Sequence, residues 1–299
     1  ATIYAIDSIA AGTNQLVISG GLERMSNAPQ LLMTGRKGIR LGHGQTFDHM
    51  FLDGLEDAYT GGAMGSFAQA TADAHGLTRE AMDQYAIASL ERAKSATESG
   101  VLQGEITPVT IKTRRGEHTV EHDEQPLKGR PDKIPSLRPA FTKDGTITAA
   151  NSSSISDGAS ALLVASAAAV EAHNLQPMAK IVAHSRFSRP PEEFTLAPVG
   201  AIEKLLERTG WNAADVDLWE INEAFAMVTM LAMNAFNLDH DRVNVHGGAC
   251  AQGHPIGSTG SRILVTLAHA MQHYGKQRGI AALCIGGGEA TAVAIERVV

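Results

Sequence analysis

The chain shows the same order of features near both ends, and this repeat constrains its fold more than any other feature. "ATIYAIDSIAAG" has helical spacing and ends in Gly12, and "QLVISGGLE" then predicts a buried strand that ends in two glycines. "SRILVTLAHAMQHYG" ends in Gly275, and "IAALCIGGGEATAVAIERV" follows as a strand, a glycine turn and a second strand. The repeat predicts two similar α/β halves with helices packed on sheets.

The two copies differ in what precedes the helix. Strand-like "RVNVHG" and a glycine-rich loop come before the second helix, whereas the first helix begins at Ala1. We therefore expect the opening strands of the first half to be absent. Residues 1–24 then form the remainder of the N-terminal half, 25–145 a polar, loop-rich inserted domain, 146–178 the end of that half, and 179–299 the C-terminal half.

Composition narrows the class of protein. The 299 residues are 43% hydrophobic and 19% charged, and no apolar run reaches the roughly 20 residues that span a bilayer. With no signal peptide at the start, a cytoplasmic protein without membrane partners is expected. The net charge of -7 argues against nucleic-acid binding, so an anionic ligand needs local cations. The two cysteines suit a reducing compartment.

Three polar residues at predicted turns could carry chemistry. His254 lies among four glycines in "GACAQGHPIGSTGSR", where backbone can come close to a ligand, although most single histidines only satisfy a hydrogen bond. Cys284 precedes "IGGG" at a strand end, and its alternative role is a buried structural thiol. Asn222 lies at a strand-to-helix junction, where Asn is most often a helix N-cap. A base, a thiol and amide donors together are typical of acyl transfer.

Two other chemistries are disfavoured. His246, Cys250 and His254 are spaced four apart, as metal ligands on one helix face would be, but the intervening glycines make that helix improbable. The sequence has no G-x-S-x-G motif, the turn that carries the nucleophile in many serine hydrolases, so serine hydrolysis is disfavoured. We therefore expect no metal site.

Three motifs, "INEAFA", "GGACAQGHPIGSTGSR" and "CIGGGEATA", resemble the carboxy-terminal signatures of the thiolase family in order and spacing. The resemblance runs from Ala1 to Val299 and includes "VISGGLERMSNAP", "LRPAF" and "GTITAANSSSISDGASA". It is most similar to bacterial acetyl-CoA C-acetyltransferases. It implies a five-layer α/β/α/β/α fold of two repeated halves with a loop domain inserted in the first, in a homodimer or homotetramer.

The implied activity is an acyl transfer: two molecules of acetyl-CoA give acetoacetyl-CoA and CoA, or a short 3-ketoacyl-CoA is cleaved in reverse. Coenzyme A thioesters are then substrates, with no separate cofactor, and fatty acid metabolism is the setting. The resemblance implies that His254 is the activating base and that Cys284 transfers the proton to or from the acetyl enolate. Asn222, through a water, and the backbone N–H of Gly286 each serve an oxyanion hole. We expect His254 and the glycine-turn amides to lower the pKa of the Cys284 thiol.

The resemblance also assigns substrate contacts. Ser153 lies on the pantetheine arm with Ala149 beside it, Phe141 and Met64 form the acyl pocket, and Phe194 favours short acyl groups by its bulk. Lys128 or Arg130 falls near the adenine nucleotide, although "KGRPDK" could equally be a solvated loop.

One departure from the family matters most. The nucleophilic cysteine is expected just upstream of the helix that starts at Ala1, so it is not in this chain, and Cys250 is expected to be a small core side chain. A truncated or nucleophile-less chain that binds acyl-CoA without catalysis is therefore the alternative function. A ketoacyl synthase is a weaker alternative, disfavoured by "NEAFA" and "CIGGG".

Overall fold

Two sheets enclose a layer of helices. The computed structural model describes residues 1–298. Its main sheet has the order β7-β10-β9-β8, with β8 parallel to β9 and the other pairs antiparallel, and a second sheet pairs β1 with β6. The strands are β1 (Leu16–Arg24), β2 (Gln30–Leu31), β3 (Phe47–Asp48), β4 (Val109–Thr113), β5 (Gly116–Val120), β6 (Asp157–Ala165), β7 (Ala179–Ser188), β8 (Leu218–Ile221), β9 (Arg278–Ile285) and β10 (Glu289–Arg297).

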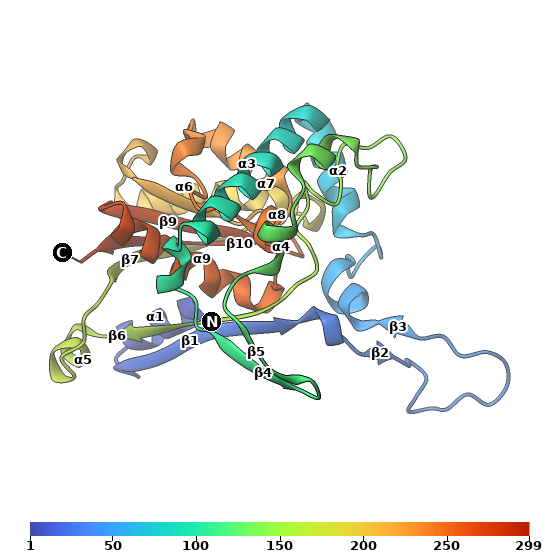
Figure 1. Cartoon of the computed structure of the whole chain (residues 1–299), viewed down its shortest axis with the longest axis horizontal. Helices are drawn as coiled ribbons and strands as arrows, with labels where there is room; N and C mark the ends of the chain where they lie inside the picture. Colours follow the sequence, from blue (N-terminus) through green and yellow to red (C-terminus); the bar gives the residue numbers. More distant parts are fainter. Residues whose placement is uncertain (299) are drawn as a thin grey trace.

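Helices cover the main sheet on both faces. The long helix α9 lies between the two sheets beside α1, and α6 packs on the opposite face of the main sheet (Figure 1). The helices are α1 (Thr2–Ala10), α2 (Met64–Ala74), α3 (Arg79–Glu98), α4 (Glu124–Lys128), α5 (Ala167–Ala172), α6 (Ala197–Thr209), α7 (Ala226–Phe236), α8 (Ala249–Gln252) and α9 (Ile256–His273). No helix within residues 1–298 is long and apolar enough to cross a membrane.

Four layers are therefore present: the β1-β6 sheet, the central helices, the main sheet and α6 with its neighbours. The fifth layer of the expected fold would cover the outer face of β1 and β6. In the described residues that face carries exposed apolar side chains, including Ile18 at 79% and Leu22 at 72% exposure. The α/β prediction is confirmed, whereas residues 1–298 form four layers and not five.

Long amphipathic helices follow their sequence pattern closely. In α9, Ile263, Leu267 and Met271 recur at four-residue spacing and pack into the core against the main sheet. The helices before Gly12 and Gly275 end as predicted, because both glycines take positive φ angles of +75° and +63°.

The first glycine pair does not end its strand. β1 continues through Gly20 and Gly21 to Arg24, and all but one of its residues are exposed or half-buried, so the prediction of a buried strand ending there is wrong. A Cβ on Gly21 would lie 1.7 Å from the backbone oxygen of Gly257. Glycine is needed here because the start of α9 packs directly on β1.

The stretch "RVNVHG" is not a strand either. Its only ladder contact within the described residues is a single bridge between Val243 and Trp219. Residues 25–145 hold α2, α3, α4 and two small hairpins, β2-β3 and β4-β5, in keeping with a segment rich in loops. Of these elements α3 is the one that packs on α7 and α8, next to the site described below.

Candidate active site

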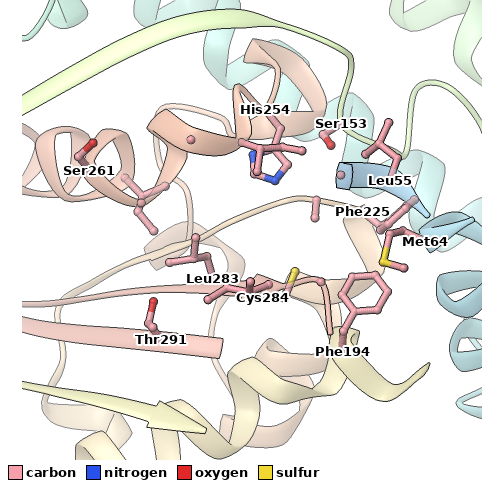
Figure 2. A pocket seen from close by; sticks show the side chains of 18 of the residues that line it. Leu55, Met64, Ser153, Phe194, Phe225, His254, Ser261, Leu283, Cys284 and Thr291 are labelled. Carbon is pink, nitrogen blue, oxygen red and sulfur yellow. The ribbon is translucent and has the colours of Figure 1, made fainter. Parts of the chain in front are cut away.

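A pocket of about 680 Å³ lies beside the carboxyl end of β9. The N-terminal ends of α1, α2 and α9 and the turn between β9 and β10 contribute to its walls. Figure 2 shows Met64 of α2, Ser261 of α9 and Cys284 of β9 among the side chains that line it. The residues singled out from the sequence that line it are Met64, Phe141, Ser153, Phe194, His254, Cys284 and Gly286. Segments far apart in the sequence therefore meet in one mostly apolar pocket.

The backbone before His254 has a conformation that favours glycine. Gly253 has a φ of +92°, and a Cβ there would lie 2.0 Å from Ser156 Oγ. The His254 backbone N–H donates to the carbonyl of Ser154 at 3.3 Å, and α9 begins two residues later. The loop thus presses against residues 154–156 and holds the imidazole at the pocket wall.

The His254 ring has a polar neighbour on each side. Its Nδ1 lies 2.5 Å from Thr259 Oγ1, and its Nε2 lies 3.4 Å from Asn222 Nδ2. Burial, with a smaller contribution from the nearby Arg262 guanidinium, lowers the pKa of His254 to about 4. The imidazole is therefore neutral at pH 7 and can act as a base.

Asn222 is not a helix N-cap. The next helix, α7, begins four residues later with Phe225 at its N-cap position. Asn222 instead continues the line of β8, where its backbone N–H donates to Ala282 O at 2.9 Å. Its side-chain Oδ1 is buried and has no hydrogen-bond partner within residues 1–298. Asn222 is buried and lies outside the pocket lining, so its side chain contacts the pocket only through His254.

Cys284 lies across the pocket from His254, near the end of β9 (Figure 2). Its side chain is 6% exposed, and burial raises the pKa of the thiol to about 12. The expectation of a lowered pKa is wrong for this structure, because desolvation outweighs the hydrogen bond from the backbone. Cys284 is therefore a thiol, and a proton donor, at neutral pH.

Three of the predicted substrate contacts lie outside the pocket lining. Ala149 is exposed, Lys128 pairs with Glu124 at 3.6 Å, and Arg130 pairs with Asp132 at 3.2 Å. Both cations are mostly exposed surface groups here, and their contact with a nucleotide stays a prediction.

A backbone crossing places Ser153 in the pocket. Its N–H donates to the carbonyl of Ala224 at 3.0 Å, and Ser152 bridges to Phe225. The Phe225 ring meets Phe194 edge-on at 6.4 Å and Phe141 at 6.1 Å between centroids. These aromatic rings form a compact apolar wall beside Ser153.

His246, Cys250 and His254, whose spacing would suit metal ligands on one helix, do not share a helix. α8 covers only Ala249–Gln252, and positive φ angles at Gly247 and Gly253 break the backbone on both sides. Cys250 packs at the edge of a core cluster, as expected for a small apolar side chain, and burial raises the pKa of its thiol well above the usual value.

Sequence reasoning missed Glu223, which organises the site from behind. This carboxylate is fully buried and accepts four hydrogen bonds at 2.7 to 3.0 Å. The donors are Tyr85 and Ser89 of α3, Asn244, and the Cys250 backbone N–H. The Glu223 side chain therefore connects α3 and the loop before His254 to the segment that carries Asn222. An acid within the apolar run "LWEINEAFAMV" was the available signal, because buried carboxylates need such partners.

Comparison with known proteins agrees with this geometry. Residues 1–168 match the family model described as thiolase, N-terminal domain, and residues 175–297 match that of thiolase, C-terminal domain. An acetyl-CoA acetyltransferase of Schizosaccharomyces pombe is 42% identical over 300 residues, covering 100% of this chain and 76% of the relative.

Two solved structures are similar over the whole chain. The acetyl-CoA acetyltransferase of Bacillus anthracis superimposes with a TM-score of 0.96 at 39% identity, covering 100% of this chain and 76% of that one. The Acat5 thiolase of Ascaris suum, solved in complex with coenzyme A, gives a TM-score of 0.93 at 40% identity with the same coverage. The chain therefore belongs to the thiolase family.

Proposed function

We propose that this protein transfers acetyl groups between coenzyme A thioesters, converting two molecules of acetyl-CoA to acetoacetyl-CoA and CoA, or cleaving short 3-ketoacyl-CoA in reverse. The observation that carries the proposal is a neutral imidazole, His254, facing a thiol, Cys284, across one apolar pocket. Similarity to acetyl-CoA acetyltransferases and to a thiolase bound to coenzyme A supports the substrate class.

His254 is the base in this proposal. Its Nε2 takes the proton of the thiol that attacks the substrate's carbonyl carbon, which makes that sulfur a strong nucleophile. In the cleavage direction the C2–C3 bond then breaks, the acyl group stays on the attacking sulfur, and the electron pair leaves as the enolate of acetyl-CoA.

Cys284 handles the second proton. Because its thiol is protonated at neutral pH, it donates its proton to the enolate carbon in the cleavage direction and regains one from the incoming CoA thiol. In condensation the same sulfur removes the proton. The raised pKa therefore favours the donor state at the start of cleavage.

Donors at the pocket wall stabilise the oxygen charge. His254 lines the pocket, the Asn222 side chain lies beside it but is buried outside the pocket lining, and Gly286 lies on the turn after Cys284. In the proposal these two places hold the two oxyanions that form during acyl transfer and enolate formation. Fixed donors in an apolar pocket are effective because little reorganisation is needed.

The acyl-accepting cysteine is, in this proposal, neither Cys250 nor Cys284. Ala1 and Thr2, at the N-terminal end of α1, line the pocket. A cysteine immediately before this helix would therefore face the same substrate, in line with the family resemblance. Intact mass provides the first check: residues 1–299 account for 31.5 kDa, and a larger mass would be compatible with such a segment.

The alternative function is acyl-CoA binding without transfer, which the same mostly apolar pocket with Ser153 on its wall would also serve. One experiment separates the two. The purified protein is incubated with acetyl-CoA, and both bound CoA and covalent acetyl adducts are measured by calorimetry and mass spectrometry. An acetylated cysteine supports transfer, and CoA binding without an adduct supports the alternative. If neither CoA binding nor an adduct is detected, both functions are contradicted.

A further inference from the structure

The hydroxyl of Thr259 sits between the His254 ring and a backbone carbonyl. Thr259 lies in the first turn of α9 and is fully buried. Its Oγ1 is 2.5 Å from His254 Nδ1 and 3.0 Å from the carbonyl oxygen of Pro255, four residues before it. Threonine in a helix often bonds the carbonyl at this spacing, so the rotamer is an ordinary one.

Counting protons assigns the direction of both bonds. The Thr259 hydroxyl has one proton, and the Pro255 carbonyl can only accept. When the hydroxyl donates to this carbonyl, its oxygen is left to accept, and Nδ1 of the neutral His254 ring has to be the donor. All three groups are then satisfied in one chain from ring to hydroxyl to carbonyl.

The contact at Nε2, on the other side of the His254 ring, is consistent with Nδ1 as the donor. His254 Nε2 faces the Asn222 amide nitrogen, which can only donate, at 3.4 Å. Nε2 therefore accepts and carries a lone pair. The opposite tautomer would set an N–H against an N–H unless the Asn222 amide turned over, and it would remove the hydroxyl bond to Pro255.

We propose that Thr259 is a positioning residue that fixes His254 in the tautomer with the proton on Nδ1, so that Nε2 presents a lone pair to the pocket. The catalytic consequence rests on the proposed function, since only this tautomer can take a thiol proton through Nε2. The tautomer itself does not depend on that function. Thr259 acts through His254 and does not line the pocket.

The test measures the tautomer directly. Protein labelled with ¹⁵N-histidine is studied by NMR at pH 7, and the His254 signals are assigned by their loss in His254→Ala. We expect a protonated Nδ1 and an unprotonated Nε2 in the unmodified protein. Thr259→Val, which keeps the shape but removes the hydroxyl, shifts protonation toward Nε2, and Thr259→Ser restores the original pattern.

Kinetics provides the second readout. Thr259→Val should lower kcat for thiolysis by about 100-fold with KM changed less than about twofold, within the range of a lost general base, and Thr259→Ser should recover most of it. Thr266→Val is the matched control, because Thr266 is also a buried hydroxyl of α9 but bonds Glu105. It should leave the His254 signals and kcat unchanged.

Two results would overturn the proposal: a proton on Nε2 in the unmodified protein, or an unchanged tautomer in folded Thr259→Val. The first does not use Thr259→Val, so poor folding of that variant does not prevent a decision. A tautomer that depends on Thr259 in a protein without thiolysis activity would uphold the positioning role and contradict the proposed function instead.

Discussion

His254 has to stay neutral to act as a base, and its burial has a consequence for stability. Its pKa falls from 6.5 to about 4 on folding, so the unfolded chain binds more protons between these values. The free energy of unfolding is therefore not reduced by this group above pH 6.5, and it decreases as the pH falls from 6.5 toward 4. Between pH 7 and pH 5 the loss should be about 2 kcal/mol.

Urea unfolding at pH 7 and pH 5 checks this prediction. His254→Gln removes the titration, so its midpoint should fall less over the same range than that of the unmodified protein. Exposed His173 provides a control, because His173→Gln should keep the original pH dependence. Equal pH dependence in His254→Gln and the unmodified protein would contradict the buried, neutral state.

Phe194 is expected to limit the length of the acyl group. Its ring is 3% exposed and packs edge-on against Phe225 at the pocket wall. Acetoacetyl-CoA should therefore be cleaved faster than 3-oxohexadecanoyl-CoA, and Phe194→Val should raise the relative kcat/KM of the long substrate about 10-fold. Phe47→Ala, outside the pocket, should not. Comparable rates for both substrates in the unmodified protein would be evidence against this role.

At the scale of elements, Glu223 holds α3 against the loops that carry Asn222 and His254. Glu223→Gln places an amide N–H₂ among four hydrogen-bond donors, so we expect a loss of about 2 to 3 kcal/mol in the free energy of unfolding. Glu207→Gln, at an exposed position of α6, should change stability by less than about 0.5 kcal/mol. Similar unfolding midpoints for the two variants would show that the buried network adds little.

The elements predicted best from the sequence are those with local signals. Helices α1 and α9 have apolar periodicity, and they end next to Gly12 and Gly275, which take positive φ angles as expected. The end of strand β1 was predicted wrongly, because Gly21 is required by the close approach of α9 and not by a turn. The contact joins Gly21 to Gly257, which lies 236 residues later in the sequence.

Two of the residues that motifs singled out, His254 and Cys284, line the pocket, and Asn222 contacts His254 from outside the lining. Their electrostatics were not predictable, because the Cys284 pKa depends on burial by elements distant in the sequence. Thr259 and Glu223 were missed for a related reason: each acts through a contact that only the folded chain forms. The sequence therefore identified individual residues, but it could not predict the contacts and pKa values that arise from packing between distant segments.

At the scale of the molecule, the layers bring the two halves together at one pocket. The central helices α1 and α9 both begin at its wall, and the main sheet supplies Cys284 from its carboxyl end. This arrangement places a base from one loop opposite a thiol from another (Figure 2). The central claim is that these two groups act on the same coenzyme A thioester.

Thiolysis of acetoacetyl-CoA by the purified protein and three variants tests this claim most directly. His254→Ala and Cys284→Ala should each lower kcat at least about 100-fold, because each removes a proton-transfer group. Cys250→Ala should stay within about twofold, since that thiol lies outside the pocket lining. Full activity in His254→Ala or Cys284→Ala would contradict the account.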